Sequence, residues 1–207
     1  MKKYLDYLIK SIFAGIMIGI AGTVYLRVDN NIVGAFLFSI GLLVICMYGM
    51  NLYTGKIGYI LINKLNYIYE LLITILGNFI GTFLVARLVL LTRFKSVSDK
   101  AVDLVNLKLN DNLFSIFILA VLCGILMYIA VNNYKKINNE IGKYSCIFMC
   151  VIVFILSGFE HSIANMYYIS VANLLSLKSL LYIFIMILGN SVGSILIALY
   201  YNRFYKN

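Results

Sequence analysis

The sequence predicts an all-α integral membrane protein with six transmembrane segments, arranged as two inverted three-helix repeats in which the second and fifth helices are broken. Three observations support this fold class. Hydrophobic residues make up 63% of the 207-residue chain and charged residues only 12%, which is far from the composition of a soluble domain. Long apolar runs follow one another with short polar connections, and a stretch of twelve residues occurs in similar form in both halves.

Each segment is an apolar run with little or no charge. A hydrocarbon core of about 30 Å is crossed by about 20 helical residues, and four of the runs have about this length. The second and fifth runs are too long for a single crossing, so we expect each to be interrupted near the middle of the membrane. In order, the runs are 8–26, 32–62, 71–91, 113–131, 144–177 and 180–201.

The two interruptions are predicted from glycine and polar residues, because the chain contains no proline. The first lies in 49–58, where three of ten residues are glycine. The second begins at Gly158 and includes Glu160 and His161, the only charged group and the only imidazole in 144–177. Irregular backbone at membrane depth is tolerated only where it is buried in protein or lines a cavity, and ionisable residues at that depth usually mark a pathway. The sequence therefore predicts a pore.

Within this break we expect His161 to face the pore. Neighbouring residues on a helix point about 100° apart, so only one of the two polar side chains can face the lumen. Glu160 would then bond to loop backbone or to a neighbouring helix.

The repeated stretch divides the chain into two copies. Residues 75–86 and 187–198 are identical at seven of twelve positions. Three segments are an odd number, so the second copy must run through the membrane upside down, as in many channels and transporters. We predict one membrane channel domain over 1–207, with repeats at about 1–95 and 104–207, in which the two broken helices meet near the centre of the membrane.

The net charge of +9 describes topology and does not indicate a nucleic-acid partner. If the N-terminus is inside, ten lysines and arginines, including Lys206, lie on the inner side of the membrane. Six, including Lys95, lie on the outer side. We therefore expect a multi-pass protein of the cell inner or plasma membrane, embedded in the lipid bilayer, with both termini in the cytoplasm. Cys146 and Cys150 share a helical face but have no third or fourth ligand nearby, so neither a metal nor a cofactor is expected.

Residues 159–166, Phe-Glu-His-Ser-Ile-Ala-Asn-Met, resemble the signature of the formate/nitrite transporter family, whose members are pentameric aquaporin-like channels for small monovalent anions. The resemblance implies an aquaporin-like fold, a homopentamer, and a weak-acid anion as substrate, namely formate, nitrite or hydrosulfide. The stretch 51–55 is similar to the family's other break motif, a mobile loop that faces the central histidine, which implies a hydrogen bond between Thr54 and His161. Asn51 takes the place of an acidic residue and Tyr53 that of a phenylalanine, so the resemblance does not extend to a mobile loop or to pH gating by that carboxylate.

The resemblance also implies roles for residues that the pattern alone would assign to the core or the surface. The run 38–42, Phe-Ser-Ile-Gly-Leu, and Phe154 match family positions that form an outer constriction of Phe38, Leu42 and Phe154, with Leu52 as the inner one. Lys108 matches a vestibule lysine, although without the resemblance it reads equally well as a solvated charge. Gly124 replaces one pore asparagine, and Asn190 matches a second.

The expected mechanism starts with an anion drawn in by Lys108 and by the positive N-terminal ends of the half-helices. Protonation by or near His161 would let it cross as a neutral acid. Three alternatives compete. A neutral-solute channel of aquaporin type would be expected to carry an Asn-Pro-Ala motif, which this chain lacks because it has no proline. An intramembrane enzyme would need paired catalytic groups, so we do not expect an enzyme. A structural membrane subunit fits the composition but gives no reason for two polar breaks.

Overall fold

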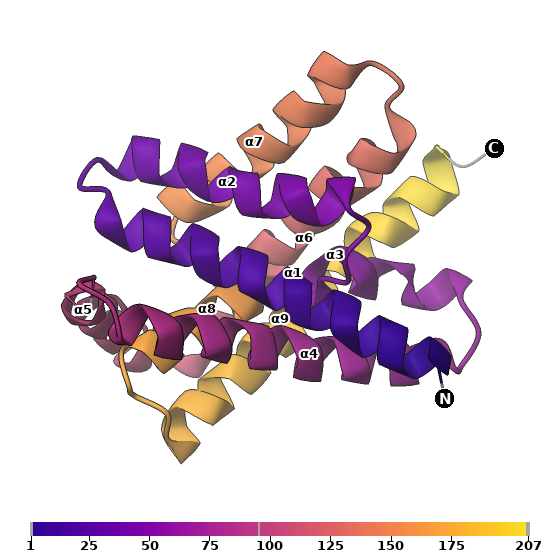
Figure 1. Ribbon diagram of the computed structural model, residues 1–207. Coiled ribbons are helices and arrows are strands. Elements are labelled where there is room, and N and C mark those ends of the chain that lie inside the picture. The colour runs from indigo at the N-terminus through magenta and orange to yellow at the C-terminus, as the bar shows by residue number, and fades with distance from the viewer. Residues whose placement is uncertain (1, 95, 206–207) are drawn as a thin grey trace.

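The computed structural model describes residues 2–94 and 96–205, and over these residues all regular structure is helical. Figure 1 shows long helices lying side by side, with both chain ends at the same end of the molecule. Four helices are long and apolar enough to cross a membrane: α1 (Lys2–Arg27), α4 (Tyr67–Leu90), α6 (Leu113–Lys136) and α9 (Leu177–Phe204). Lys95 and Lys206, which enter the orientation count, lie outside the described residues.

The two segments that are too long for one crossing are both broken, as the sequence predicts. The first consists of α2 (Asn31–Met47), α3 (Tyr53–Lys56) and the 3-10 helix η1 (Ile57–Ile62), and the second of α7 (Glu140–Leu156) and α8 (Ser162–Val171).

A left-handed glycine ends the first helix of each broken segment. Gly49 has φ +60° and Gly158 has φ +68°. The next backbone N–H then bonds back to the helix, from Met50 to the Ile45 carbonyl and from Phe159 to the Phe154 carbonyl, each at 2.9 Å. This is the usual way in which a glycine stops a helix. No atom lies within 4 Å of a Cβ added at Gly49 or Gly158, so backbone conformation alone requires glycine there.

Replacement of Gly49 by alanine should therefore lower the free energy of unfolding by about 1–2 kcal/mol, the cost of left-handed backbone for an L-residue. Gly49→Asn should lose less, because asparagine tolerates this conformation better. Denaturation followed by helical circular dichroism in detergent measures both. Gly142→Ala is the matched control, since Gly142 has no positive φ and space for a methyl group, and it should cost nothing. If Gly142→Ala lowered the free energy of unfolding as much as Gly49→Ala, left-handed backbone would not be the reason for glycine at position 49.

The long helices associate as two tight pairs, α1 with α4 and α6 with α9. Glycines allow each pair to approach at backbone distance. A methyl group added at Gly15 would meet the main chain of Asn78 on α4, and one at Gly124 would meet the main chain of Asn190 on α9. Small residues at such contacts are typical of membrane helix pairs, and here they hold both asparagines at the centre of the fold.

One helix, α5 (Val97–Leu109), lies where the sequence analysis expected only an outer loop. Val97, Ala101 and Val105 form its buried face, and α5 packs against α8. At its outer side Lys100 forms an ion pair with Asp29 at 2.7 Å, and this ammonium lowers the pKa of the Asp29 carboxyl. The helix carries Lys108 to the second break.

Candidate functional site

The second break is held by the side-chain amide of Asn190 on α9. Its Oδ1 accepts the N–H of Ser162 at 2.9 Å, and its Nδ2 donates to the carbonyl oxygens of Glu160 and Ala120, both at 2.8 Å. Asn190 is fully buried. The side chain thus satisfies two backbone groups of the interrupted helix, the Ser162 N–H and the Glu160 carbonyl, as is required at membrane depth, and ties them to Ala120 of α6.

Asn78 on α4 does the same at the first break. Its Oδ1 accepts the N–H of Tyr53 at 3.0 Å, and its Nδ2 donates to the carbonyl oxygens of Asn51 and Ser11, both at 2.8 Å. The acceptor and donor groups therefore have the same arrangement at both breaks. No role was predicted for Asn78 from the sequence, although it is the repeat partner of Asn190 in the shared Ile-Leu-Gly-Asn stretch.

His161 and Thr54 connect the two half-helices. Thr54 Oγ1 lies 2.9 Å from His161 Nε2, and both residues are buried. His161 Nδ1 accepts the N–H of Ala164 at 3.1 Å and so caps α8. A ring nitrogen that accepts a backbone N–H carries no proton, so in the neutral imidazole the proton is on Nε2. Nε2–H therefore donates to the Thr54 hydroxyl oxygen.

Glu160 turns away from Thr54 and forms an ion pair with Lys108 of α5. The ammonium lies 2.8 Å from Oε1 and 2.6 Å from Oε2, and Oε2 also accepts Asn165 Nδ2–H at 2.8 Å. Both side chains of the pair are largely buried. The Lys108 charge is thus compensated by a carboxylate, and Glu160 bonds to a neighbouring helix, α5, which is one of the two expected kinds of partner.

A cavity of about 110 Å³ lies on the α5 side of this histidine. We call it the α5-side cavity. Phe154 stacks on the His161 ring with the ring centroids 5.5 Å apart, and Phe38 meets Phe154 edge-on at 6.0 Å. Its lining includes Tyr25, Lys108, Phe154, His161, Asn165 and Tyr168.

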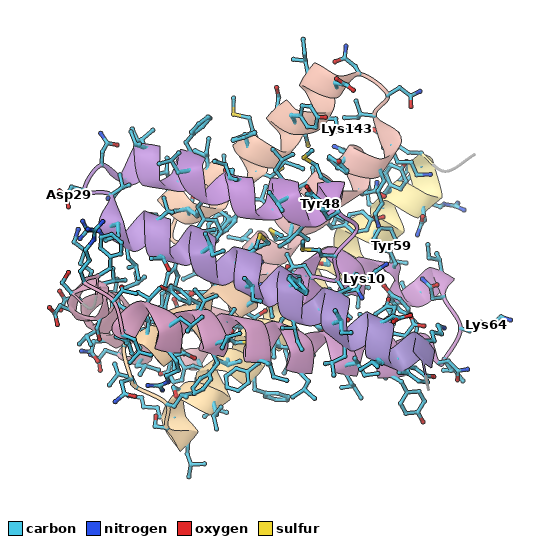
Figure 2. The ribbon with its side chains drawn as sticks, viewed as in Figure 1. Lys10, Asp29, Tyr48, Tyr59, Lys64 and Lys143 are labelled. Carbon is cyan, nitrogen blue, oxygen red and sulfur yellow. The ribbon has the colours of Figure 1, made fainter. Side chains whose placement is uncertain are left out.

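A second cavity of about 150 Å³ lies toward the end of the molecule that carries both termini. We call it the terminal-side cavity. Figure 2 shows Lys10, Tyr59 and Lys64 at this end and Asp29 at the opposite one. Its lining includes Cys46, Leu52, Lys56, Val131, Tyr134 and Lys135. Two cavities on either side of a buried polar pair are the arrangement expected of a pore with a central constriction.

Residues 1–203 match the model of the family described as formate/nitrite transporter. The chain belongs to the formate/nitrite transporter family. This family comprises transport proteins, and the chain is accordingly a multi-pass membrane protein.

Individual relatives are similar over most of the chain. It is 26% identical over 211 residues to the formate-nitrite transporter of Plasmodium falciparum (isolate 3D7), covering 86% of this chain and 68% of the relative. It is 29% identical over 180 residues to the uncharacterized transporter YwcJ of Bacillus subtilis (strain 168), covering 77% and 70%. It is 26% identical over 151 residues to the formate channel FocA of Haemophilus influenzae, covering 68% of this chain and 53% of FocA.

The fold is also that of solved channels. A pentameric formate channel with formate bound superposes with a TM-score of 0.84 at 22% identity, covering 100% of this chain and 99% of the other. An ion channel of the same family gives 0.81 at 23% identity, covering 95% and 89%. At these identities the likeness shows the fold.

Two side-chain hydrogen bonds attach the first break of this chain to neighbouring helices. Asn51 Nδ2 donates to the Tyr7 carbonyl on α1 at 3.1 Å, and the Tyr53 hydroxyl lies 2.7 Å from Ser191 Oγ on α9. An aspartate at position 51 could not make the first bond, and a phenylalanine at position 53 could not make the second. The two departures from the family motif thus favour a fixed break over a mobile one.

The remaining predicted residues lie around these groups. Phe38 and Leu42 are one turn apart on α2 and both are buried, while Leu52 lines the terminal-side cavity. Over residues 2–94 and 96–205, no three His, Cys, Asp or Glu side chains gather as a metal site would require. Cys146 accepts a hydrogen bond from Asn133 at 3.4 Å.

Proposed function

We propose that this protein is a channel for small monovalent weak-acid anions, with formate as the first candidate and nitrite and hydrosulfide next. The observation that carries the proposal is the buried pair of His161 and Thr54, which lies between the two cavities and offers an N–H and a hydroxyl in otherwise apolar surroundings. Formate is placed first because FocA of Haemophilus influenzae and a structural neighbour are named formate channels. Formate is proposed as a substrate of this chain because the chain shares its family and fold with these proteins.

The half-helices supply positive potential at the centre. α8 begins at Ser162 next to the α5-side cavity, and α3 begins at Tyr53, one residue beyond Leu52 of the terminal-side cavity. A helix N-terminus carries the equivalent of about half a positive charge. These fixed dipoles favour an anion at the constriction, whereas Lys108 contributes less than expected because Glu160 compensates it.

His161 serves in this proposal as a hydrogen-bond donor. A proton on Nδ1 would break the cap with Ala164, and such a cap stabilises a helix by about 1 kcal/mol. The neutral ring in turn does not release its single Nε2 proton readily. The proton that neutralises the permeating anion therefore comes from the bulk solution as a hydronium ion, which leaves only water behind, and the acid crosses past Leu52 and Phe154 without the cost of burying a charge.

The assembly and placement of the protein follow the same reasoning. We infer a homopentamer, as in the solved pentameric formate channel, with a pore in each protomer. The protein would sit in the cell membrane with both termini in the cytoplasm, the side that the excess of lysine and arginine favours. Native mass spectrometry from detergent would give the pentamer mass, and a monomer would contradict it.

The function is tested by stopped-flow light scattering of proteoliposomes in gradients of formate, nitrite, hydrosulfide and chloride, at about pH 5.5 and about pH 7.5, on either side of an ordinary histidine pKa. We expect flux of the weak-acid anions that rises at the lower pH, with chloride excluded. Equal flux of chloride at both pH values would indicate a simple anion pore. Flux of glycerol or urea without any anion flux would favour a neutral-solute channel.

A further inference from the structure

The terminal-side cavity holds two ammonium groups. Lys56 of the first half-helix and Lys135 near the end of α6 both line it, together with apolar residues such as Leu52 and Val131. Among the described residues no aspartate or glutamate belongs to this lining. A cavity with low-dielectric walls and charge of one sign raises the local concentration of the opposite ion.

Tyrosine rings hold both lysines in place. The Lys56 ammonium donates to the Tyr7 hydroxyl oxygen at 3.0 Å and lies 5.0 Å from the centre of the Tyr7 ring. The Lys135 ammonium lies 4.3 Å from the centre of the Tyr59 ring. Such contacts are worth about 0.5–2 kcal/mol and fix the position of a cation. A tyrosine ring carries no net charge, so it does not compensate a lysine as a carboxylate would, and each ammonium group has N–H donors left for another acceptor.

The nearest carboxylate is engaged elsewhere. Glu70 interacts with the Tyr7 hydroxyl and is close enough to act on the Lys56 charge, but it forms no ion pair with Lys56. It forms its own ion pair with Lys3 at 2.7 Å. Over residues 2–94 and 96–205, the ion pairs are Lys3–Glu70, Lys100–Asp29 and Lys108–Glu160, so neither Lys56 nor Lys135 is in one.

The two cavities therefore differ in charge. In the α5-side cavity Lys108 is paired with the buried Glu160 carboxylate at 2.6 Å. In the terminal-side cavity Lys56 and Lys135 have no carboxylate of the described residues in an ion pair with them. We propose that Lys56 and Lys135 form an anion-binding site in the terminal-side cavity, which holds a small monovalent anion next to Leu52 before it enters or after it leaves the constriction. The identity of the anion rests on the proposed function, but the site itself does not.

Cys46 gives a readout that needs no transport. Its thiol is half-buried and lines the same cavity. The chain is labelled in detergent with an anionic reagent, 2-sulfonatoethyl methanethiosulfonate, or a cationic one, 2-trimethylammonioethyl methanethiosulfonate. Modification of Cys46 is followed by site-resolved mass spectrometry. The ratio of the two rates cancels the intrinsic reactivity of the thiol and reports the local potential.

We expect the anionic reagent to be favoured in the unmodified chain, and the ratio to fall about tenfold or more in the double variant Lys56→Gln/Lys135→Gln, within the range of rate effects for charge-lined clefts. Lys56→Arg/Lys135→Arg should keep the ratio, which separates charge from misfolding. Lys64→Gln removes an exposed lysine at the same end of the molecule and should change nothing. A ratio unchanged in the double glutamine variant would overturn the site.

Formate then tests binding. Sodium formate should slow the anionic labelling of Cys46 relative to sodium gluconate at the same ionic strength, because gluconate is a much larger anion than formate and fits a small-anion site less well. The protection should disappear in the double glutamine variant. Equal labelling in both salts would overturn binding of small anions there, even if formate crosses the membrane. Protection at Cys46 without any formate flux in liposomes would keep this site and reject the proposed function.

Discussion

Glu160→Gln should lower the free energy of unfolding by about 3–5 kcal/mol, the usual cost of removing one partner from a buried ion pair. The glutamine can still accept hydrogen bonds from Lys108 and Asn165, so the loss arises from the charge. Lys108 is only 13% exposed at its side chain, and no second carboxylate accepts from it among the described residues. Denaturation in detergent followed by circular dichroism measures the change, since the chain has no tryptophan.

Two further variants separate the charge effect from a general loss of packing. Lys108→Met/Glu160→Gln removes both charges and should regain most of the stability, because apolar replacement of a buried pair is often neutral or better. Lys100→Gln on the same helix α5 breaks an ion pair whose side chains are 50% and 95% exposed, and should change stability by at most about 1 kcal/mol. If Lys100→Gln cost as much as Glu160→Gln, the buried pair would not be what holds α5 on α8.

The positions of the breaks could be predicted because they depend on local sequence. A membrane helix that must stop without proline needs a glycine in left-handed conformation, and Gly49 and Gly158 are in this conformation. The bond between Thr54 and His161 joins residues 107 positions apart, which no local pattern reveals. The family resemblance implied it, and the residues alone gave only a lone histidine in an apolar run.

The partner of Glu160 could not be predicted, for a physical reason. Lys108 lies on an amphipathic helix whose buried face has only Val97, Ala101 and Val105, so its pattern is too short and too polar to be distinguished from a loop. The charge of Lys108 therefore looked available to attract anions. The structure instead pairs it with the one carboxylate of the second break. Lys56 and Lys135, which have no ion pair among the described residues, lie in the other cavity, and from the sequence both counted only among the inner-side positive charges.

His161→Phe should reduce formate flux by about 2- to 12-fold, because the acid that passes is neutral and a hydrogen bond between neutral groups contributes about 0.5–1.5 kcal/mol. Phenylalanine fills similar space and can stack on Phe154, so the passage keeps its width, but it loses the Nε2–H donor and also the Nδ1 acceptor that caps α8. The measurement is the rate of formate-driven swelling of proteoliposomes with equal amounts of reconstituted protein.

His161→Gln restores an N–H donor and should recover part of the flux. Thr54→Val has nearly the same volume and removes the acceptor of that donor, so adding it to His161→Phe should reduce flux by less than the product of the two single effects, as expected for residues in contact. Because a neutral His161 acts as a donor at both pH values, the increase in flux at the lower pH should persist in His161→Gln. If His161→Gln abolished this pH dependence, the proton would pass through the imidazole itself, and Nδ1 would have to release Ala164 during each transfer.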